Sequence, residues 1–350
     1  MNGLNLTACA LSVCVTATLL AACGGSPPTF SSPGALSRGG GVAEFAARWP
    51  VAARFHARRL WAVPDIARNP RLLFISDWGA RTVDIYSMPD LRLKGQVGNF
   101  EFPYGECADR TGFIWVVDQP TRTIAKLSRT GEAVDTLKDG HGDPYSCAVD
   151  PTSGNLAVTN LDSPGSGGAG NVVIYVHAHG SGTVITIPHM YLYTFDGYDT
   201  RGYLWVDGYS TTGFFTVASC KASSCSRISL SGGTIYEAGF MQWAEGQKTW
   251  YVADGECGGI YNAFCIYPVS RSGALGKAIT LTDPQGQAVC DMFQGVITNG
   301  KSPVLVGGVN SRFNCYGTVG VARWSLPAGG DSTNGTSDVR QPFGAAISEK

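Results

Sequence analysis

The sequence is poor in charged residues, and the two signs balance. Only 15% of its 350 residues are charged, and 26 Lys and Arg stand against 27 Asp and Glu, a net charge of −1. The basic excess that recruits nucleic acid is therefore missing. Hydrophobic residues make up 44% of the chain, which excludes the disordered class, because that class combines high charge with few apolar residues. We expect a folded protein with no nucleic-acid partner.

Several catalytic and metal-binding motifs are also missing. The sequence has no C-x-x-C, no H-E-x-x-H and no G-x-S-x-G, so it does not indicate a zinc ribbon, a zinc protease or an α/β-hydrolase. Residues 165–170 fit G-x-G-x-x-G, but an apolar strand follows them where a dinucleotide site needs a helix. His177 and His179 are predicted to share one strand face without a third ligand. We expect no metal and no cofactor.

The first 22 residues carry no charge and are mostly apolar or small. A short apolar run that ends in small residues is typical of a secretion signal. The motif Leu20-Ala21-Ala22-Cys23 resembles the lipobox of bacterial lipoproteins, which implies cleavage before Cys23 and lipidation of that residue. An uncleaved anchor or an ordinary signal peptide cut elsewhere are the alternatives. We expect a bacterial cell-envelope protein, anchored by its lipid and facing the periplasm or the exterior.

The next two segments differ in composition from the rest. Residues 23–44 are rich in Gly, Ser and Pro, which predicts a flexible tether. Residues 45–71 contain six Arg and one Asp, and we interpret them as a solvated basic neck, with contact to anionic lipid as the alternative. Residues 72–350 remain for the folded domain.

An apolar strand that ends in Asp, Asn or Gly recurs six times. The strand ends, at residues 77, 118, 160, 207, 254 and 307, are separated by 41, 42, 47, 47 and 53 residues. This spacing predicts an all-β, six-bladed propeller of about four strands a blade. A Pro-aromatic pattern marks the innermost strands and returns at residues 341–348. We therefore expect the last strand to complete the first blade, with Ala346 beside Ile75.

Two of the repeats carry a longer motif after the second strand. These are Asp77-x-x-x-Arg81-Thr-Val83 and Asp118-x-x-x-Arg122-Thr-Ile124. They resemble NHL repeats, within the group of six-bladed propellers that includes gluconolactonase-type and TolB-like members. The resemblance implies a divalent metal held by oxygen ligands in the channel. One aligned channel position is a poor metal ring, because it reads Glu106, Cys147, Asp196, Phe240, Gln294 and Ala345.

Loops that enter inner strands or leave second strands share one face, around the mouth of the channel. Their aromatic, carboxylate and amide groups suit a sugar, peptide or protein ligand. The candidate residues for this mouth are Asp77, Trp78, Tyr104, Glu106, Asp118, Gln119, Tyr145, Asp196, Asp207, Tyr209, Asp254 and Glu256. The strand-end Asp residues have a structural alternative, in which Asp77 with Arg81 and Asp118 with Arg122 tie their own hairpins.

Eight cysteines remain once Cys9 and Cys14 leave with the signal and Cys23 is lipidated. An even number in an exported protein indicates disulfides. Two pairs are local, two cysteines lie on neighbouring inner strands and two on the mouth face: Cys220 and Cys225, Cys257 and Cys265, Cys107 and Cys147, Cys290 and Cys315. Buried, unpaired thiols are the alternative.

These observations predict a lipid-anchored propeller, monomeric, that binds a protein, peptide or carbohydrate without catalysis. A metal-dependent hydrolase or lactonase of the gluconolactonase type is the first alternative. A lyase or another propeller enzyme, whose residues the sequence does not identify, is the second.

Overall fold

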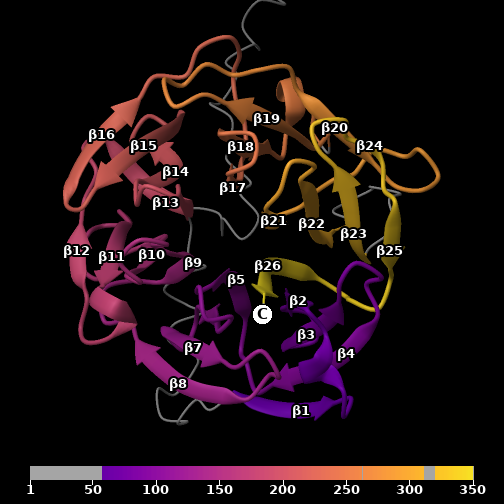
Figure 1. The fold of residues 1–350 in the computed structure, drawn as a ribbon. Coiled ribbons are helices and arrows are strands. Elements are labelled where there is room, and N and C mark those ends of the chain that lie inside the picture. Colours follow the sequence, from indigo (N-terminus) through magenta and orange to yellow (C-terminus); the bar gives the residue numbers. More distant parts are fainter. Residues whose placement is uncertain (1–56, 262, 311–319, 350) are drawn as a thin grey trace, which may run out of the picture.

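The computed structural model describes residues 57–261, 263–310 and 320–349. In this part of the chain six sheets, antiparallel except for one short outer pair, stand like blades around a central axis (Figure 1). The protein is therefore the all-β, six-bladed propeller that the repeat spacing predicts. The N-terminal segments expected as signal peptide and tether lie outside the described residues.

The blades follow the order of the repeats. Blade 1 contains, from the axis outward, β26 (Pro342–Glu349), β2 (Arg71–Asp77), β3 (Thr82–Ser87), β4 (Leu93–Gly98) and β1 (Arg58–Ala62). Blade 2 contains β5 (Pro103–Ala108), β6 (Ile114–Asp118), β7 (Thr123–Leu127) and β8 (Ala133–Lys138). Blade 3 contains β9 (Pro144–Val149), β10 (Leu156–Asn160), β11 (Asn171–Tyr175) and β12 (Thr183–Ile185).

The second half of the ring is less regular. Blade 4 contains β13 (Met190–Tyr198), β14 (Leu204–Ser210), β15 (Phe215–Lys221) and β16 (Ser224–Ile228). Blade 5 contains β17 (Ala238–Ala244), β18 (Thr249–Asp254), β19 (Cys265–Val269), β20 (Ile279–Thr282) and β24 (Gly330–Asp331). Blade 6 contains β21 (Gly295–Ile297), β22 (Val304–Val309), β23 (Gly320–Ser325) and β25 (Asn334–Thr336).

Three short 3-10 turns complete the described elements: η1 (Ile66–Arg68), η2 (Val176–Ala178) and η3 (Cys257–Gly259). His177 lies in η2, with a positive φ of 48°, so the prediction of two imidazoles on one strand face is wrong. None of the described helical segments is long and apolar enough to cross a membrane.

The repeated apolar segments are the second strands of the six sheets. Every residue of β6 and β10 is buried, because a second strand is covered by a neighbouring blade on each face. A continuous apolar run of this length is what such two-sided burial requires. The sequence pattern therefore reports the position of each strand within its blade.

The ring closes through the C-terminal strand. β26 pairs with β2, and Ala346 lies opposite Phe74 and Ala345 opposite Ile75. In Figure 1 the yellow end of the chain lies beside the indigo strands of blade 1. The predicted closure is confirmed, and the inner edge of blade 1 gains a partner that it would otherwise lack.

The propeller begins earlier in the chain than the sequence analysis places it. β1 pairs with β4 as a fifth, outermost strand of blade 1. Arg58 and Arg59 therefore belong to a sheet, although the arginine count assigned them to a solvated neck. Charge composition misses this strand because its residues are mostly exposed at the rim, where apolar side chains are not required.

The inner strands approach one another so closely that two of them need glycine. A Cβ at Gly105 would lie 2.7 Å from the carbonyl oxygen of Tyr145 on β9, and one at Gly344 would lie 2.2 Å from that of Tyr104 on β5. Both distances are shorter than any normal contact. The Pro-aromatic-Gly pattern of these strands is thus a condition for a narrow channel.

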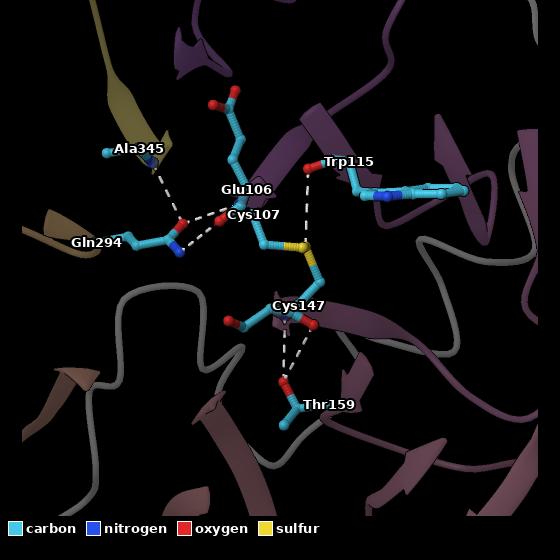
Figure 2. The surroundings of a disulfide bond; sticks show 8 residues. Glu106, Cys107, Trp115, Cys147, Thr159, Gln294 and Ala345 are labelled. Atoms are coloured by element: carbon cyan, nitrogen blue, oxygen red, sulfur yellow. Dashed lines mark hydrogen bonds between the residues drawn. A yellow bond between two sulfur atoms is a disulfide. The ribbon is translucent and has the colours of Figure 1, made fainter. Parts of the chain in front are cut away.

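Three disulfides form as the sequence predicts. Cys107–Cys147 joins the inner strands β5 and β9 of blades 2 and 3 (Figure 2). The other two bridges, Cys220–Cys225 and Cys257–Cys265, each close a local hairpin. Cys290 is also disulfide-bonded, and its expected partner Cys315 lies outside the described residues. Disulfides are typical of proteins outside the cytoplasm.

Ring closure predicts the effect of a charge at the closing strand. Ala346 is 2% exposed, so Ala346→Asp places an unpaired carboxylate between β26 and the core, at a cost of several kcal/mol, about 3–5. The matched control is Glu349→Gln on the same strand, which removes only an exposed pair with Arg71. We expect urea denaturation to show a large loss for the first variant and at most about 1 kcal/mol for the second. Equal stability of the two variants would contradict closure.

Candidate functional site

Four of the predicted mouth residues are backbone clamps. The carboxylate of Asp118, at the end of β6, accepts hydrogen bonds from the backbone N–H groups of Glu101 and Phe102, at 3.1 and 2.8 Å. These two residues lead into the inner strand of the same blade. Equivalent bonds hold the loops of blades 1 and 5 through Asp77 and Asp254. In blade 4 the bond lies inside the sheet, where Asp207 of β14 accepts from the backbone N–H of Phe195 in β13. The clamps fix the mouth loops from below, and all four side chains are buried.

The two repeat arginines link neighbouring blades. The guanidinium of Arg122 contacts Asp143, ahead of β9, at 2.7 and 2.8 Å. Arg81 contacts Glu101, ahead of β5, at 3.5 Å. The prediction that each arginine ties its own hairpin through the preceding Asp is therefore wrong. A positive φ at both positions, 60° and 52°, turns each side chain toward the next blade.

Aromatic rings fill the mouth end of the channel. Phe343 stacks on Tyr104 and Phe293, with ring centroids 4.5 and 4.6 Å apart, and meets the edge of Tyr145 at 5.2 Å. Phe195 packs on Tyr145 at 5.3 Å. All five side chains are at most 9% exposed. We call these five residues the aromatic lid. Each ring pair stabilises the packed arrangement by about 0.5–1.5 kcal/mol beyond burial, so the rings form a firmly packed cover.

A polar layer lies beneath the aromatic lid. Gln294 bridges two inner strands: its Oε1 accepts from the backbone N–H groups of Glu106 and Ala345, and its Nε2 donates to the carbonyl of Glu106 (Figure 2). The Glu106 carboxyl accepts from the Ser76 hydroxyl at 2.7 Å, but its Oε2 is buried without a hydrogen-bond partner. Neither carboxyl oxygen of Asp196 takes part in a hydrogen bond of normal geometry.

Burial favours the protonated form of these two carboxyl groups. Desolvation raises the pKa of Glu106 to about 8, against the lowering effect of the Ser76 hydroxyl. Desolvation also raises the pKa of Asp196 to about 8, opposed by the nearby Ser146 hydroxyl. Desolvation is the largest cause in both groups, and no cationic side chain among the described residues lowers either pKa, so the neutral form is favoured at pH 7.

The remaining predicted residues are divided between core and rim. Tyr209 is buried, and its Oη accepts a hydrogen bond from the Ala238 backbone at 2.7 Å. Trp78, Gln119 and Glu256 are half-buried at the rim of the mouth. Of the twelve candidates only these three remain available to a ligand without rearrangement, because the others form the clamps, the lid, the polar layer or an interblade contact.

Sequence reasoning missed four exposed apolar residues on the same face. Phe214 lies in the β14–β15 hairpin, Tyr236 precedes β17, and Ile260 and Tyr261 follow η3 in the β18–β19 loop. One signal was present for two of them, because Ile260 and Tyr261 stand inside the hairpin closed by Cys257–Cys265. Apolar residues in such a short covalent loop have no core to enter.

The described residues do not fit the metal that a gluconolactonase-type propeller would hold. No cluster of three or more His, Cys, Asp or Glu side chains suited to a metal ion is found within residues 57–261, 263–310 and 320–349. The channel offers Glu106 and Asp196, whose raised pKa values favour the neutral form. The amide of Gln294 is already engaged by backbone groups.

Two hollows in the described surface lie between blades. One of about 250 Å³ is lined by residues of blades 3 and 4, including Ile174 and Leu204. The other, of about 350 Å³, is lined by residues of blades 5 and 6, including Val289 and Trp324. Neither is lined by the aromatic lid.

Comparison with known proteins supports the fold. No protein-family model matches the sequence, and no curated protein is significantly similar to it. The chain is similar to a chain in the crystal structure of a nidogen–laminin complex, at 10% identity and a TM-score of 0.58 over 79% of this chain and 98% of that one. At these identities the likeness shows the fold alone.

Two bacterial structures are similar in the same way. A protein of unknown function from Bacteroides caccae matches with 13% identity and a TM-score of 0.60, over 81% of this chain and 100% of that one. A catalytically inactive virginiamycin B lyase from Staphylococcus aureus, solved with quinupristin, matches with 11% identity and a TM-score of 0.51, over 83% and 92%.

The polar layer predicts a pH dependence of stability. A folded-state pKa raised from the ordinary 4.5 or 3.8 to about 8 means that the native protein keeps two protons which the unfolded chain releases. Unfolding free energy therefore falls as pH rises between about 5 and 8, by about 1 kcal/mol per pH unit for each group, and levels off above the folded pKa.

The double variant Glu106→Gln, Asp196→Asn removes this linkage. We expect urea unfolding between pH 5 and 8.5 to give a shallower slope for the variant than for the native protein, with a relative gain in stability at pH 8. The exposed Glu132→Gln is the matched control, because it should leave the slope unchanged. A double variant with the native slope would show that these carboxyls are ionised in the fold.

Proposed function

We propose that this protein is an exported, lipid-anchored propeller that binds a protein, peptide or carbohydrate on its mouth face without catalysing a reaction. The observation that carries the proposal is the aromatic lid. It closes the channel with packed side chains, so a ligand meets the rim instead of the channel. The buried carboxyl groups beneath the lid have no route to a bound molecule through this cover.

Export and anchoring are supported by two independent features. The lipobox-like Leu20–Cys23 follows an uncharged apolar segment. The disulfides of the propeller form and persist in oxidising compartments. The lipid would hold the propeller to the bacterial membrane from the N-terminal side, with residues 23–44 as a flexible spacer.

The structural neighbours do not choose between binding and catalysis. One is a chain of a nidogen–laminin complex, and another is a lyase solved with quinupristin. Since one fold carries different activities, function has to be argued from the site. Here the rim offers apolar and acidic side chains on fixed loops, an arrangement that supports binding.

A metal-dependent hydrolase or lactonase is the second candidate. The buried, unpartnered oxygens of Glu106 and Asp196 favour it, because unsatisfied carboxyl groups in a core call for an explanation. A cation bound there would require both carboxyl groups to be ionised, and a substrate would have to pass the aromatic lid to reach it.

Thermal unfolding with metal ions separates the two candidates. For a non-catalytic module we expect the Tm to be unchanged, within about 1 °C, by sub-millimolar Ca²⁺ or Zn²⁺, because a ligand stabilises only the state that it binds. A rise of several degrees that disappears in the Glu106→Gln, Asp196→Asn variant would overturn this expectation and support the hydrolase.

Lipidation predicts the behaviour of a Cys23 variant. In a bacterial host grown with an alkyne fatty acid, the native chain should be labelled and found with the membrane fraction, and Cys23→Ser should lose both properties. Cys14→Ser is the matched control, since that residue leaves with the signal. Label retained by Cys23→Ser, or found in neither protein, would contradict the proposed anchor.

A further inference from the structure

Exposed apolar side chains gather on one part of the mouth face. Among the residues that the structure describes, nine large apolar side chains are exposed, and four of them lie on the mouth loops of the adjacent blades 4 and 5. The four are Phe214, Tyr236, Ile260 and Tyr261, exposed by 71%, 45%, 65% and 53%. We call them the apolar rim patch. A group of exposed apolar residues on one face marks an interaction surface more often than scattered ones do.

The loops that carry this patch are fixed in place. One oxygen of Asp254 accepts from the backbone N–H groups of Tyr236, Glu237 and Glu256, at 3.2, 3.0 and 3.1 Å. The clamp therefore joins the loop before β17 to the loop after β18. The disulfide Cys257–Cys265 closes the second loop. A Cβ built on Gly259 would lie 3.2 Å from the Tyr236 ring, so the two loops pack together.

The patch connects to the neighbouring blade through Tyr209. Its Oη accepts from the Ala238 backbone of blade 5, and its ring meets Phe215, next to Phe214, at 6.4 Å. The apolar residues are thus presented by a preorganised frame, and binding would not have to order them first.

In the described mouth segments of blades 4 and 5, the charged residues have one sign. The mouth segments of the two blades, residues 205–216, 234–239 and 254–261, contain four acidic residues and no Lys or Arg. Asp207 and Asp254 are buried clamps, and the Oε1 atom of Glu237 is buried as well, which leaves the half-buried Glu256 as the acidic residue at the surface. Aromatic faces beside carboxylates attract Arg and Lys side chains through cation–π contacts and ion pairs.

We propose that the apolar rim patch docks a cationic segment of a partner protein, in which Arg or Lys alternates with apolar residues. This rests on the proposed binding function and names the partner chemistry for its site. A membrane surface fits less well, because anionic lipids attract basic and repel acidic side chains. A sugar fits less well too, because Phe214 and Ile260 offer it no polar partner.

A selection experiment tests the proposal on the full-length protein in detergent. A random library of 15-residue peptides is selected against it, and the enriched peptides are measured by fluorescence anisotropy. We expect enrichment of Arg or Lys together with apolar residues. In the Phe214→Ser, Ile260→Ser variant the Kd of these peptides should rise at least tenfold, and in Glu256→Gln their binding should become less sensitive to salt. Val176→Ser changes an apolar residue that is exposed by 57% on blade 3, and this variant should bind as the native protein does.

The outcomes separate this inference from the broader function. If the peptides lost binding in Trp78→Ala but not in the patch variant, the proposed binding function of the mouth face would stand. The proposal that the apolar rim patch is the docking site would be overturned. Enriched peptides without cationic residues, or no enrichment at all, would also overturn it. Three further results would overturn it if they depended on Phe214 and Ile260: sugars bound on a glycan array, binding to anionic vesicles, or a dimer of the chain in sedimentation velocity.

Discussion

A ring of sheets is stable only if its ends meet, and in this protein one interaction serves both the repeat and the closure. In blades 1, 2 and 5 an Asp at the end of the second strand holds the backbone that leads into the inner strand. In blades 2 and 5 that backbone is near in sequence. In blade 1 the same bonds join Asp77 to Arg340 and Gln341, more than 260 residues away. Closure therefore depends on the local chemistry of the repeat.

The narrowness of the channel follows from the closed ring. Inner strands that meet at Gly105 and Gly344 leave room for side chains only, and aromatic rings fill that room at the mouth. Below them Glu106 and Asp196 are deprived of water, so the protonated form is favoured in each. Thus the two carboxyl groups that the sequence analysis aligns at a channel position lie in the part of the molecule that the aromatic lid covers.

Local and periodic features could be predicted from the sequence, and features that depend on the angle between blades could not. Strand spacing fixed the second strands, and the phase of Cys107 and Cys147 on neighbouring inner strands gave their bridge. The partners of Arg81 and Arg122 were mispredicted, because they lie on the next blade. β1 was missed for a similar reason, since an exposed outer strand carries no apolar pattern.

The candidate site shows the same limit more sharply. Aromatic and acidic residues near the mouth form one group in the sequence, but the structure divides them by depth into clamps, lid, polar layer and rim. Tyr145 and Tyr236 illustrate the division: both stand just before or at the start of an inner strand, yet the first is 2% exposed and the second 45%. The difference arises because Tyr145 packs against rings of three other blades, those of Tyr104, Phe195 and Phe343. Tyr236, in contrast, lies in one of the two loops that Asp254 holds together. In the proposed function, recognition would therefore be decided by loops that the repeat holds in place without specifying their side chains.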